Sequence, residues 1–274
     1  MTRIIIKPRK FTPLSFRELG EYKELFWSLA FRDFKVRYAQ TSIGIAWALL
    51  QPLISLLILN LVFGKFAKVD TNGLPHILYA SSGMACWTYF SFVLTNTGNS
   101  IISSQQMLKK IYFPRIIVPV SKSIVGLIDF GIALGIIAGL MVYYQITPSS
   151  NIIFLPFFIL INIMGALGIG IWISALTIRY RDFKYIVPFM VQIGLYITPV
   201  AFPSKYAMDM LPDGLLHLYF LNPAAGIIDG FRWCLFNNTP INGLVVLSLI
   251  SALFFFITGV IYFQRVENKI ADIV

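Results

Sequence analysis

The chain has 274 residues, of which 57% are apolar and 12% are charged, whereas soluble domains carry about 25% charged residues. Its mean hydropathy of +0.76 leaves too little polar surface to cover a water-soluble protein of this size. The composition therefore excludes a soluble globular protein, and it excludes disorder, which requires low hydrophobicity and high charge. It predicts an integral membrane protein.

The formal net charge of +10 does not indicate a nucleic-acid partner, because of where the charges lie. Nine of the 22 Lys and Arg precede Ile43, and the others lie almost entirely between long apolar runs. Basic loops around apolar spans are an orientation signal of membrane proteins, so no nucleic acid is expected. Cys86 and Cys234 form neither a CxxC motif nor a metal-binding spacing, and we interpret them as small apolar fillers.

Residues 1–42 predict a cytoplasmic N-terminus that contains a helix lying in the membrane interface. This segment has no sustained apolar core, so no cleavable signal peptide is expected. Ser15 followed by Glu18 matches a capping box at a helix start. Two apolar stripes at helical spacing and charged residues on the other faces then predict an amphipathic helix. It would be either a simple membrane anchor or a lever that a cytoplasmic partner can push.

Residues 43–263 predict a transmembrane domain of six helices, because a spanning helix needs about 20 mostly apolar residues. The six apolar stretches are 43–63, 75–97, 116–144, 152–178, 186–202 and 244–263. The second stretch is rich in polar residues, and the fifth is short and carries Pro188 and Pro199. Polar residues in a span usually face protein or water, so these two stretches are expected to line a pathway.

The distribution of Lys and Arg predicts the orientation of the chain. With the N-terminus inside, the inside segments hold eighteen of these residues and the outside segments four. This positive-inside bias predicts that both termini, including the tail 264–274, are cytoplasmic. The region 203–243 then lies outside, and its apolar pieces are too short to span. We expect short re-entrant helices there, with a cap packed on the bundle as the alternative.

Asp129 is the one acidic residue within the apolar stretches. It has two interpretations, a proton or cation site, or a hydrogen-bonding residue at a helix interface or near a wet cavity. The second is favoured because no other buried charge accompanies it. Gly131, Gly135 and Gly139 follow at intervals of four, a spacing that lets another helix approach closely.

Motifs of soluble enzyme chemistry are missing from the sequence, which has no GxxxxGK[ST], HExxH or GxSxG. The segments most informative about function are two short, basic and aromatic loops expected in the cytoplasm, residues 104–115 and 179–185. Lys and Arg there would anchor the loops at lipid headgroups. The interleaved Tyr, Phe and Pro also suggest surfaces that dock into a protein groove.

Five segments of the chain form a recognisable series. They are residues 32–52 (RDFKVRYAQTSIGIAWALLQP), 112–115 (YFPR), 180–203, 222–232 (NPAAGIIDGFR) and the tail 263–274. In this order they resemble type-2 ATP-binding-cassette export permeases over nearly the whole chain. The branch they resemble exports O-antigen, capsule or teichoic acid polysaccharides.

The resemblance implies a transport subunit that is not itself an enzyme. In this family two permeases assemble with two copies of a separate ATPase subunit, so a homodimer of this chain is expected. The resemblance also implies that ATP and Mg²⁺ are bound by the partner and no cofactor by this chain. It further implies a lipid-linked polysaccharide as substrate and a location in the cytoplasmic membrane of a bacterium, in contact with its lipids.

The resemblance also assigns residues to ATPase coupling and places part of the interfacial helix beside them. The coupling residues would be Lys109, Lys110, Tyr112, Phe113, Pro114, Arg115, Arg179, Arg181 and Asp182, and those of the interfacial helix Arg32, Asp33 and Arg37.

A polysaccharide path needs surfaces that accept sugars without trapping them, and aromatic rings offer flat faces for the apolar sides of sugars. We therefore expect a channel lined by Trp87, Tyr89, Phe90 and Tyr196, with Phe231 and Trp233 near the outer exit. Trp and Tyr also gather at membrane interfaces for ordinary reasons, which is the alternative for each of them.

Two other functions fit the same layout less well. Type-2 exporters of drugs or lipids often carry a large extracellular domain or a fused ATPase, and this sequence shows neither. A membrane glycosyltransferase would need acidic residues that hold a metal and a diphosphate near one membrane face. Asp70, Asp209, Asp213 and Asp229 are dispersed and form no DxD pair.

Overall fold

A computed structural model describes residues 20–38, 46–111, 113–180, 182–237 and 239–273. The expected capping box at Ser15 and Glu18 and the coupling candidates Tyr112 and Arg181 lie outside the described residues. Helices make up the fold, and the described residues contain no strand. The expectation of an all-α membrane protein is confirmed.

Each of the six apolar stretches contains a helix in the structure. Among the described residues, five helical segments are long and apolar enough to cross a membrane. They lie within α3 (Ala46–Leu59) with the π-helix η1 (Asn60–Phe66), α4 (His76–Gly98), α7 (Ile117–Tyr143), the 3-10 helix η2 (Ser150–Phe154) with α8 (Leu155–Arg179), and α13 (Val245–Ile273). The fifth stretch is the shorter α9 (Phe183–Ile197).

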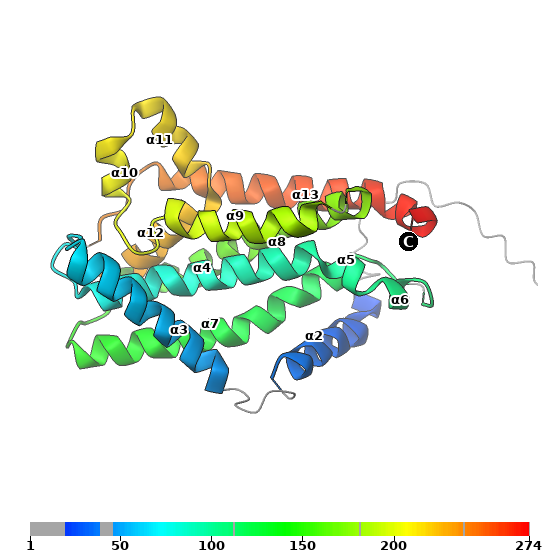
Figure 1. Cartoon of the computed structure of the whole chain (residues 1–274), viewed down its shortest axis with the longest axis horizontal. Helices are drawn as coiled ribbons and strands as arrows, with labels where there is room; N and C mark the ends of the chain where they lie inside the picture. The colour runs from blue at the N-terminus through cyan, green and yellow to red at the C-terminus, as the bar shows by residue number, and fades with distance from the viewer. Residues whose placement is uncertain (1–19, 39–45, 112, 181, 238, 274) are drawn as a thin grey trace, which may run out of the picture.

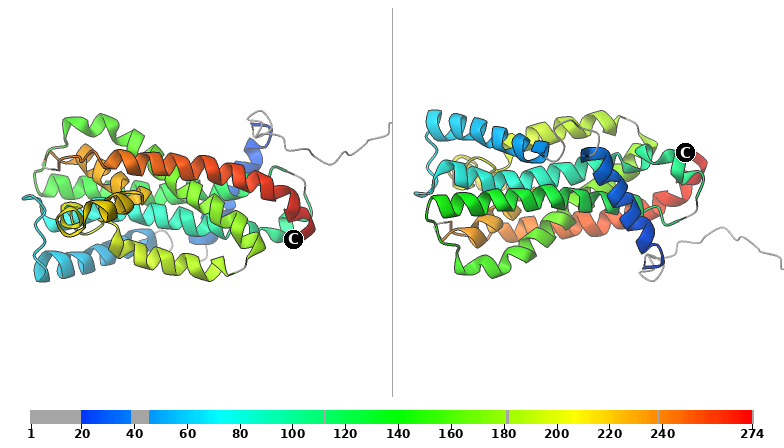
Figure 2. Two further views of the ribbon diagram at one scale, coloured as in Figure 1. Left: turned by 90° about the horizontal axis from the view of Figure 1, so that it is seen from above. Right: turned by 90° about the horizontal axis from the view of Figure 1, so that it is seen from below.

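The long helices run side by side as one bundle with two distinct ends (Figure 1). At one end lie the short helices α5 (Ser100–Ser103) and α6 (Gln105–Leu108), the α8–α9 turn and the last turns of α13. We name this the basic end, after Lys109, Lys110, Arg179 and Lys184. At the other lie α10 (Lys205–Met210), α11 (Asp213–Phe220) and α12 (Pro223–Leu235), and we name it the cap end. Helix α2 (Lys23–Tyr38) runs obliquely across α7 (Figure 2).

Proline decides where α9 ends. The apolar stretch runs to residue 202, but the helix stops at Ile197 and Thr198 is extended, with φ −79° and ψ 145°. Thr198 precedes Pro199, and the proline ring disfavours helical backbone in the residue before it. Proline also has no N–H to continue the helix. The chain therefore leaves α9 early and turns into the cap end.

Helix α12 is the buried element of the cap end. Asn222 caps its start by accepting a hydrogen bond from the Ala224 N–H at 3.1 Å, and Pro223 occupies the first turn. Eleven of its 13 residues are buried, and it packs against α4, α8 and α13. The expected apolar pieces of region 203–243 are thus helical, and the last of them belongs to the core.

Helices α8 and α13 cross closely. A Cβ placed on Gly168 would lie 2.4 Å from the backbone nitrogen of Phe256, and one on Gly259 2.5 Å from the Gly168 carbonyl oxygen. The Trp172 ring stacks on Tyr262 at 4.4 Å and its indole N–H donates to Thr258 at 3.1 Å. Glycine lets these two backbones meet, as in other membrane helix pairs.

The glycine ladder of α7 does not make such a crossing. Within the part of the chain that the structure describes, a Cβ on Gly131, Gly135 or Gly139 would meet no atom within 4 Å. All three lie on an exposed face. The expectation of tight packing at these glycines is therefore not met inside one chain.

These two sets of glycines should respond differently to alanine. Gly168→Ala should lower the free energy of unfolding by about 2 kcal/mol, because its methyl group would press on the α13 backbone. Gly135→Ala should leave stability unchanged or raise it by up to about 1 kcal/mol, because alanine favours helix. Thermal unfolding of the detergent-solubilised protein measures both. Equal melting temperatures for the two variants would contradict the crossing.

Candidate functional site

The basic end exposes two short loops. Lys109, Lys110 and Ile111 are exposed after α6, and buried Phe113 anchors this loop in the core. Pro114, next to it, is partly buried. In the second loop Arg179 and Asp182 are exposed, and the Arg179 guanidinium lies 5.3 Å from the Tyr180 ring. Together the loops form a predominantly positive surface that a protein with negative charges could contact.

Arg115 has a role inside the chain. Its backbone N–H donates to a carboxylate oxygen of Glu267 at 2.9 Å, and its guanidinium donates to the Glu267 carbonyl at 3.0 Å. Arg115 therefore joins the first loop to α13. A movement of this loop would pull on the last spanning helix.

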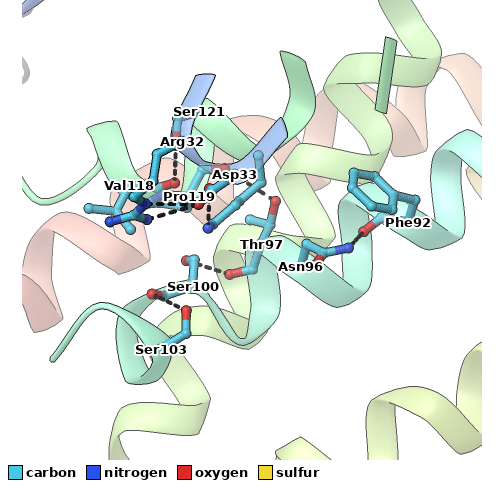
Figure 3. Close-up of polar contacts among 11 residues, drawn as sticks. Arg32, Asp33, Phe92, Asn96, Thr97, Ser100, Ser103, Val118, Pro119 and Ser121 are labelled. Carbon is cyan, nitrogen blue, oxygen red and sulfur yellow. Dashed lines mark hydrogen bonds and ion pairs between the residues drawn. The ribbon is translucent and has the colours of Figure 1, made fainter. Parts of the chain in front are cut away.

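Two of the three residues expected in the interfacial helix, Asp33 and Arg37, pair with α7. Asp33 accepts from Arg32 at 2.9 Å and from Lys122 of α7 at 2.5 Å, next to the α4–α7 contact in which Thr97 donates to the Pro119 carbonyl at 3.2 Å (Figure 3). Arg37 pairs with Asp129 of α7 at 2.6 Å. Asp33 and Arg37 thus attach α2 to the bundle.

Asp129 is held by two neighbouring residues of α2. Besides Arg37, the Tyr38 hydroxyl donates a short hydrogen bond to its carboxylate. Burial, and next Asp129, raise the pKa of Tyr38 above its usual value, so this hydroxyl stays protonated and able to donate. A cavity of about 80 Å³ borders the group. Of the two interpretations of Asp129, these contacts match a hydrogen-bonding residue at a helix interface beside a cavity.

Four of the six expected channel aromatics are buried inside the chain. They are Trp87, Tyr89, Phe90 and Phe231, each at most 7% exposed. Phe130 of α7 joins two of them, since its ring lies 5.5 Å from Tyr89 and 6.0 Å from Phe231. Trp87 packs on Gly194 of α9, where a Cβ would lie 2.4 Å from the indole ring. In a single chain these residues pack the core.

The other two candidates lie nearer the surface. The Trp233 ring of α12 lies 5.7 Å from Phe154 and is partly buried. Tyr196 of α9 is 64% exposed, with Phe189 at 63% and Tyr185 at 76%. Residues 185, 189 and 196 recur at helical spacing, so their side chains form one stripe, which we name the α9 stripe. An exposed aromatic stripe on a helix that has few contacts with the rest of its chain is a surface for a ligand, a lipid or another chain.

Arg232 is a central residue of the cap end, although it is one of the four Lys and Arg in the segments expected to lie outside. Its side chain is 1% exposed and donates to the carbonyls of Pro199 and Val200, both at 2.6 Å. It also donates to the Tyr79 carbonyl at 3.3 Å and lies 3.7 Å from the Tyr79 ring. One side chain of α12 thereby joins α4 and the end of α9. The one signal in the sequence is its spacing of three residues from Asp229, which places both on one helix face.

Asp229 borders a second cavity, of about 460 Å³, together with Asn72, Lys205 and Asn242. It lies 3.9 Å from Arg232. Burial raises the pKa of Asp229 to about 6, while Arg232 and a hydrogen bond with Ser204 act in the opposite direction. The carboxylate is thus mostly ionised at neutral pH, and it contributes one charge to a polar cavity at the cap end.

Comparison with known proteins identifies the family. The model of the ABC-2 type transporter family matches residues 24–236. The chain belongs to the ABC-2 type transporter family. A protein named O-antigen export system permease protein RfbA from Klebsiella pneumoniae is 25% identical over 93% of this chain and 96% of its own length. A protein of the same name from Myxococcus xanthus is 24% identical over 92% of this chain and 96% of its own length.

Membership of the ABC-2 type family agrees with the helices of the structure. The matched region begins in α2 and ends just after α12, so it includes the two basic loops, the α9 stripe and the Arg232 contacts. The family match and the five long apolar helices make this chain a multi-pass membrane protein. The relatives are named as permeases, which are transport subunits.

Removing the guanidinium of Arg232 should destabilise this ABC-2 protein. Arg232→Gln should lower the free energy of unfolding by about 3 kcal/mol or more, because Asp229 and the carbonyls of Pro199 and Val200 would lose their buried partner. Lys205→Gln, an exposed charge beside the same cavity, is the matched control and should have little effect. Thermal unfolding in detergent measures both, and an unchanged melting temperature for Arg232→Gln would refute the assigned role.

Proposed function

We propose that this chain is the permease subunit of an ABC exporter that moves a lipid-linked polysaccharide across the cytoplasmic membrane of a bacterium. The observation that carries the proposal is the similarity to O-antigen export permeases over more than nine-tenths of this chain and of the relatives. The polysaccharide would be of the O-antigen, capsule or teichoic acid type, and analysis of the exported glycan distinguishes these.

The energy would come from a separate ATPase subunit, two copies of which assemble with two copies of the permease. In this proposal ATP and Mg²⁺ are bound by the partner, and this chain performs no hydrolysis. We place the partner's docking site at the basic end. The support is that both loops lie at this end of the bundle and expose Lys109, Lys110, Arg179 and Asp182. Charge there would steer the association and fix its register.

The basic end would face the cytoplasm, with both termini on that side. The excess of Lys and Arg in the segments at this end supports the orientation. Helix α2, which exposes Trp27 and Phe31, would then lie in the inner membrane interface. Helices α10–α12 would face outside, with α12 as a re-entrant helix that enters the bundle from that side.

The path would run between two permease copies along the α9 stripe. Tyr185, Phe189 and Tyr196 are exposed in one chain, whereas Trp87, Tyr89, Phe90 and Phe231 fill its core. Rings on a surface offer sugars flat contacts, and their weak attraction lets a long chain slide. In this proposal the buried aromatics support α9 from behind, through Trp87 on Gly194.

The partner can be tested at the basic end. The complex purified from native membranes should contain an ATP-hydrolysing subunit, and Lys109→Glu with Lys110→Glu should reduce the co-purified ATPase about tenfold by placing like charges opposite the partner. Lys65→Glu with Lys68→Glu, an equally exposed pair at the cap end, is the matched control and should retain it. A folded wild-type permease without any ATPase would overturn the proposed function.

The path can be tested on α9. Phe189→Ala with Tyr196→Ala should lower the amount of polysaccharide at the cell surface about tenfold or more while the ATPase still co-purifies, because each lost aromatic contact is worth roughly 1 kcal/mol. Phe254→Ala, an exposed aromatic residue of α13, is the control and should export normally. Normal export by the α9 variant would exclude the stripe as the path, and an exported lipid or drug in place of a glycan would change the substrate.

A further inference from the structure

The contact between α2 and α7 has an arrangement of charges that the proposed function does not use. Helix α2 contributes Asp33 and, one turn later, Arg37. Helix α7 contributes Lys122 and, two turns later, Asp129. The acidic residue of each helix faces the basic residue of the other, at 2.5 Å near the basic end and 2.6 Å farther along.

Alternating charges of this kind allow one register only. A shift of α2 by one turn, about 6 Å, would bring Arg37 to the place of Asp33. It would then face Lys122, and two positive charges with little solvent around them repel each other strongly. The side chains of Lys122 and Asp33 are 13% and 17% exposed, so screening by water is limited. The two pairs therefore set the position of α2 along α7 as well as attaching it.

The second pair also reaches other helices. The Arg37 guanidinium lies 4.3 Å from the Phe92 ring of α4, so one side chain of α2 touches both α4 and α7. The Tyr38 hydroxyl binds the same Asp129 carboxylate from the last turn of α2. Tyr89 of α4 in turn donates to the Ser123 carbonyl of α7 at 3.3 Å. A displacement of α2 at this point would act on two spanning helices together.

A cavity beside the pair explains how these charges are tolerated among apolar helices. Arg37 and Asp129 line it together with Gln51, Ser55 and Thr88, and its volume is about 80 Å³. The cavity has room for water, which needs about 10–15 Å³, and these five side chains offer it polar partners in an otherwise largely apolar lining. Hydration reduces the desolvation cost that usually makes a buried ion pair unfavourable.

We propose that Asp129, held by Arg37 and Tyr38, is a positioning residue that locks α2 in one register on α7. A push on α2 from a cytoplasmic partner then reaches α4 and α7 without slippage. This inference rests on the proposed function, because it assigns α2 a part in transmitting the partner's movement. It also gives Asp129 a mechanical role that requires no change in its protonation.

The test is an exchange of the two charges. Arg37→Asp and Asp129→Arg are made singly and together, and each complex is examined for ATPase activity and for polysaccharide exported per ATP hydrolysed. Each single variant should retain the ATPase subunit and lose about tenfold in export per ATP, and the double variant should recover to within about threefold of the wild type. Lys35→Asp, an exposed charge of α2, is the control and should export normally.

A second readout does not depend on export. Thermal unfolding of the same four proteins should show both single variants less stable than the double variant, since the exchanged pair restores opposite charges. Where a reversed charge prevents folding, Asp129→Asn replaces it, and its export per ATP should fall severalfold. If Asp129→Asn exports normally, or the assembled exchange variant is as inactive as the single variants, the register lock is wrong.

The two proposals fail in different ways. A wild-type protein that carries no ATPase and exports no glycan would overturn the proposed function, while the stability comparison would still show whether Arg37 and Asp129 hold α2. Recovery of stability without recovery of export per ATP would overturn the transmission of movement through this contact.

Discussion

The need to satisfy backbone carbonyls in apolar surroundings governs the cap end. Pro199 stops α9 early, which frees the carbonyls of Pro199 and Val200 from helical hydrogen bonding. An unpaired carbonyl costs several kcal/mol where water is excluded. Arg232 supplies N–H donors to both carbonyls at 2.6 Å. Because Arg232 belongs to α12, this one side chain also fixes α12 against α4 and the end of α9.

The other charged residues fall into two groups, one exposed at the basic end and one in contact between α2 and α7. At the basic end, Lys109, Lys110 and Asp182 are exposed, while Arg115 is bound to Glu267 of α13. Asp33 and Arg37 of α2 point inward, to Lys122 and Asp129 of α7. In our proposal the first group receives the ATPase, and the second passes its movement on. Exposed charges can change partners during a cycle, whereas these partly buried pairs are harder to separate.

The aromatic residues divide in a similar way. Trp87 and Phe90 stack with each other at 6.0 Å in the core, and Phe130 joins Tyr89 to Phe231. Tyr185, Phe189 and Tyr196 remain on the outside of α9, where Val187 is the buried residue. Helix α9 is therefore lightly attached to its own chain and presents rings outward. A second copy facing this surface would complete the path that we propose.

The sequence by itself determined the class of protein, the helical stretches and the location of the basic loops. Composition, the length of each apolar run and the places of Lys and Arg are local properties, so they can be read without a fold. The family resemblance drawn from five segments is confirmed by the match over residues 24–236.

Only the tertiary structure decided which side chains meet. The glycines that allow a close crossing are Gly168 and Gly259, although the regular ladder of α7 is the more conspicuous pattern in sequence. Asp129 finds its partners 91 and 92 residues away in the chain. Arg232 is buried although it lies in a region expected to be outside. A sequence shows which charges and small residues are present, but the face each helix turns to its neighbours is set by packing across the whole bundle.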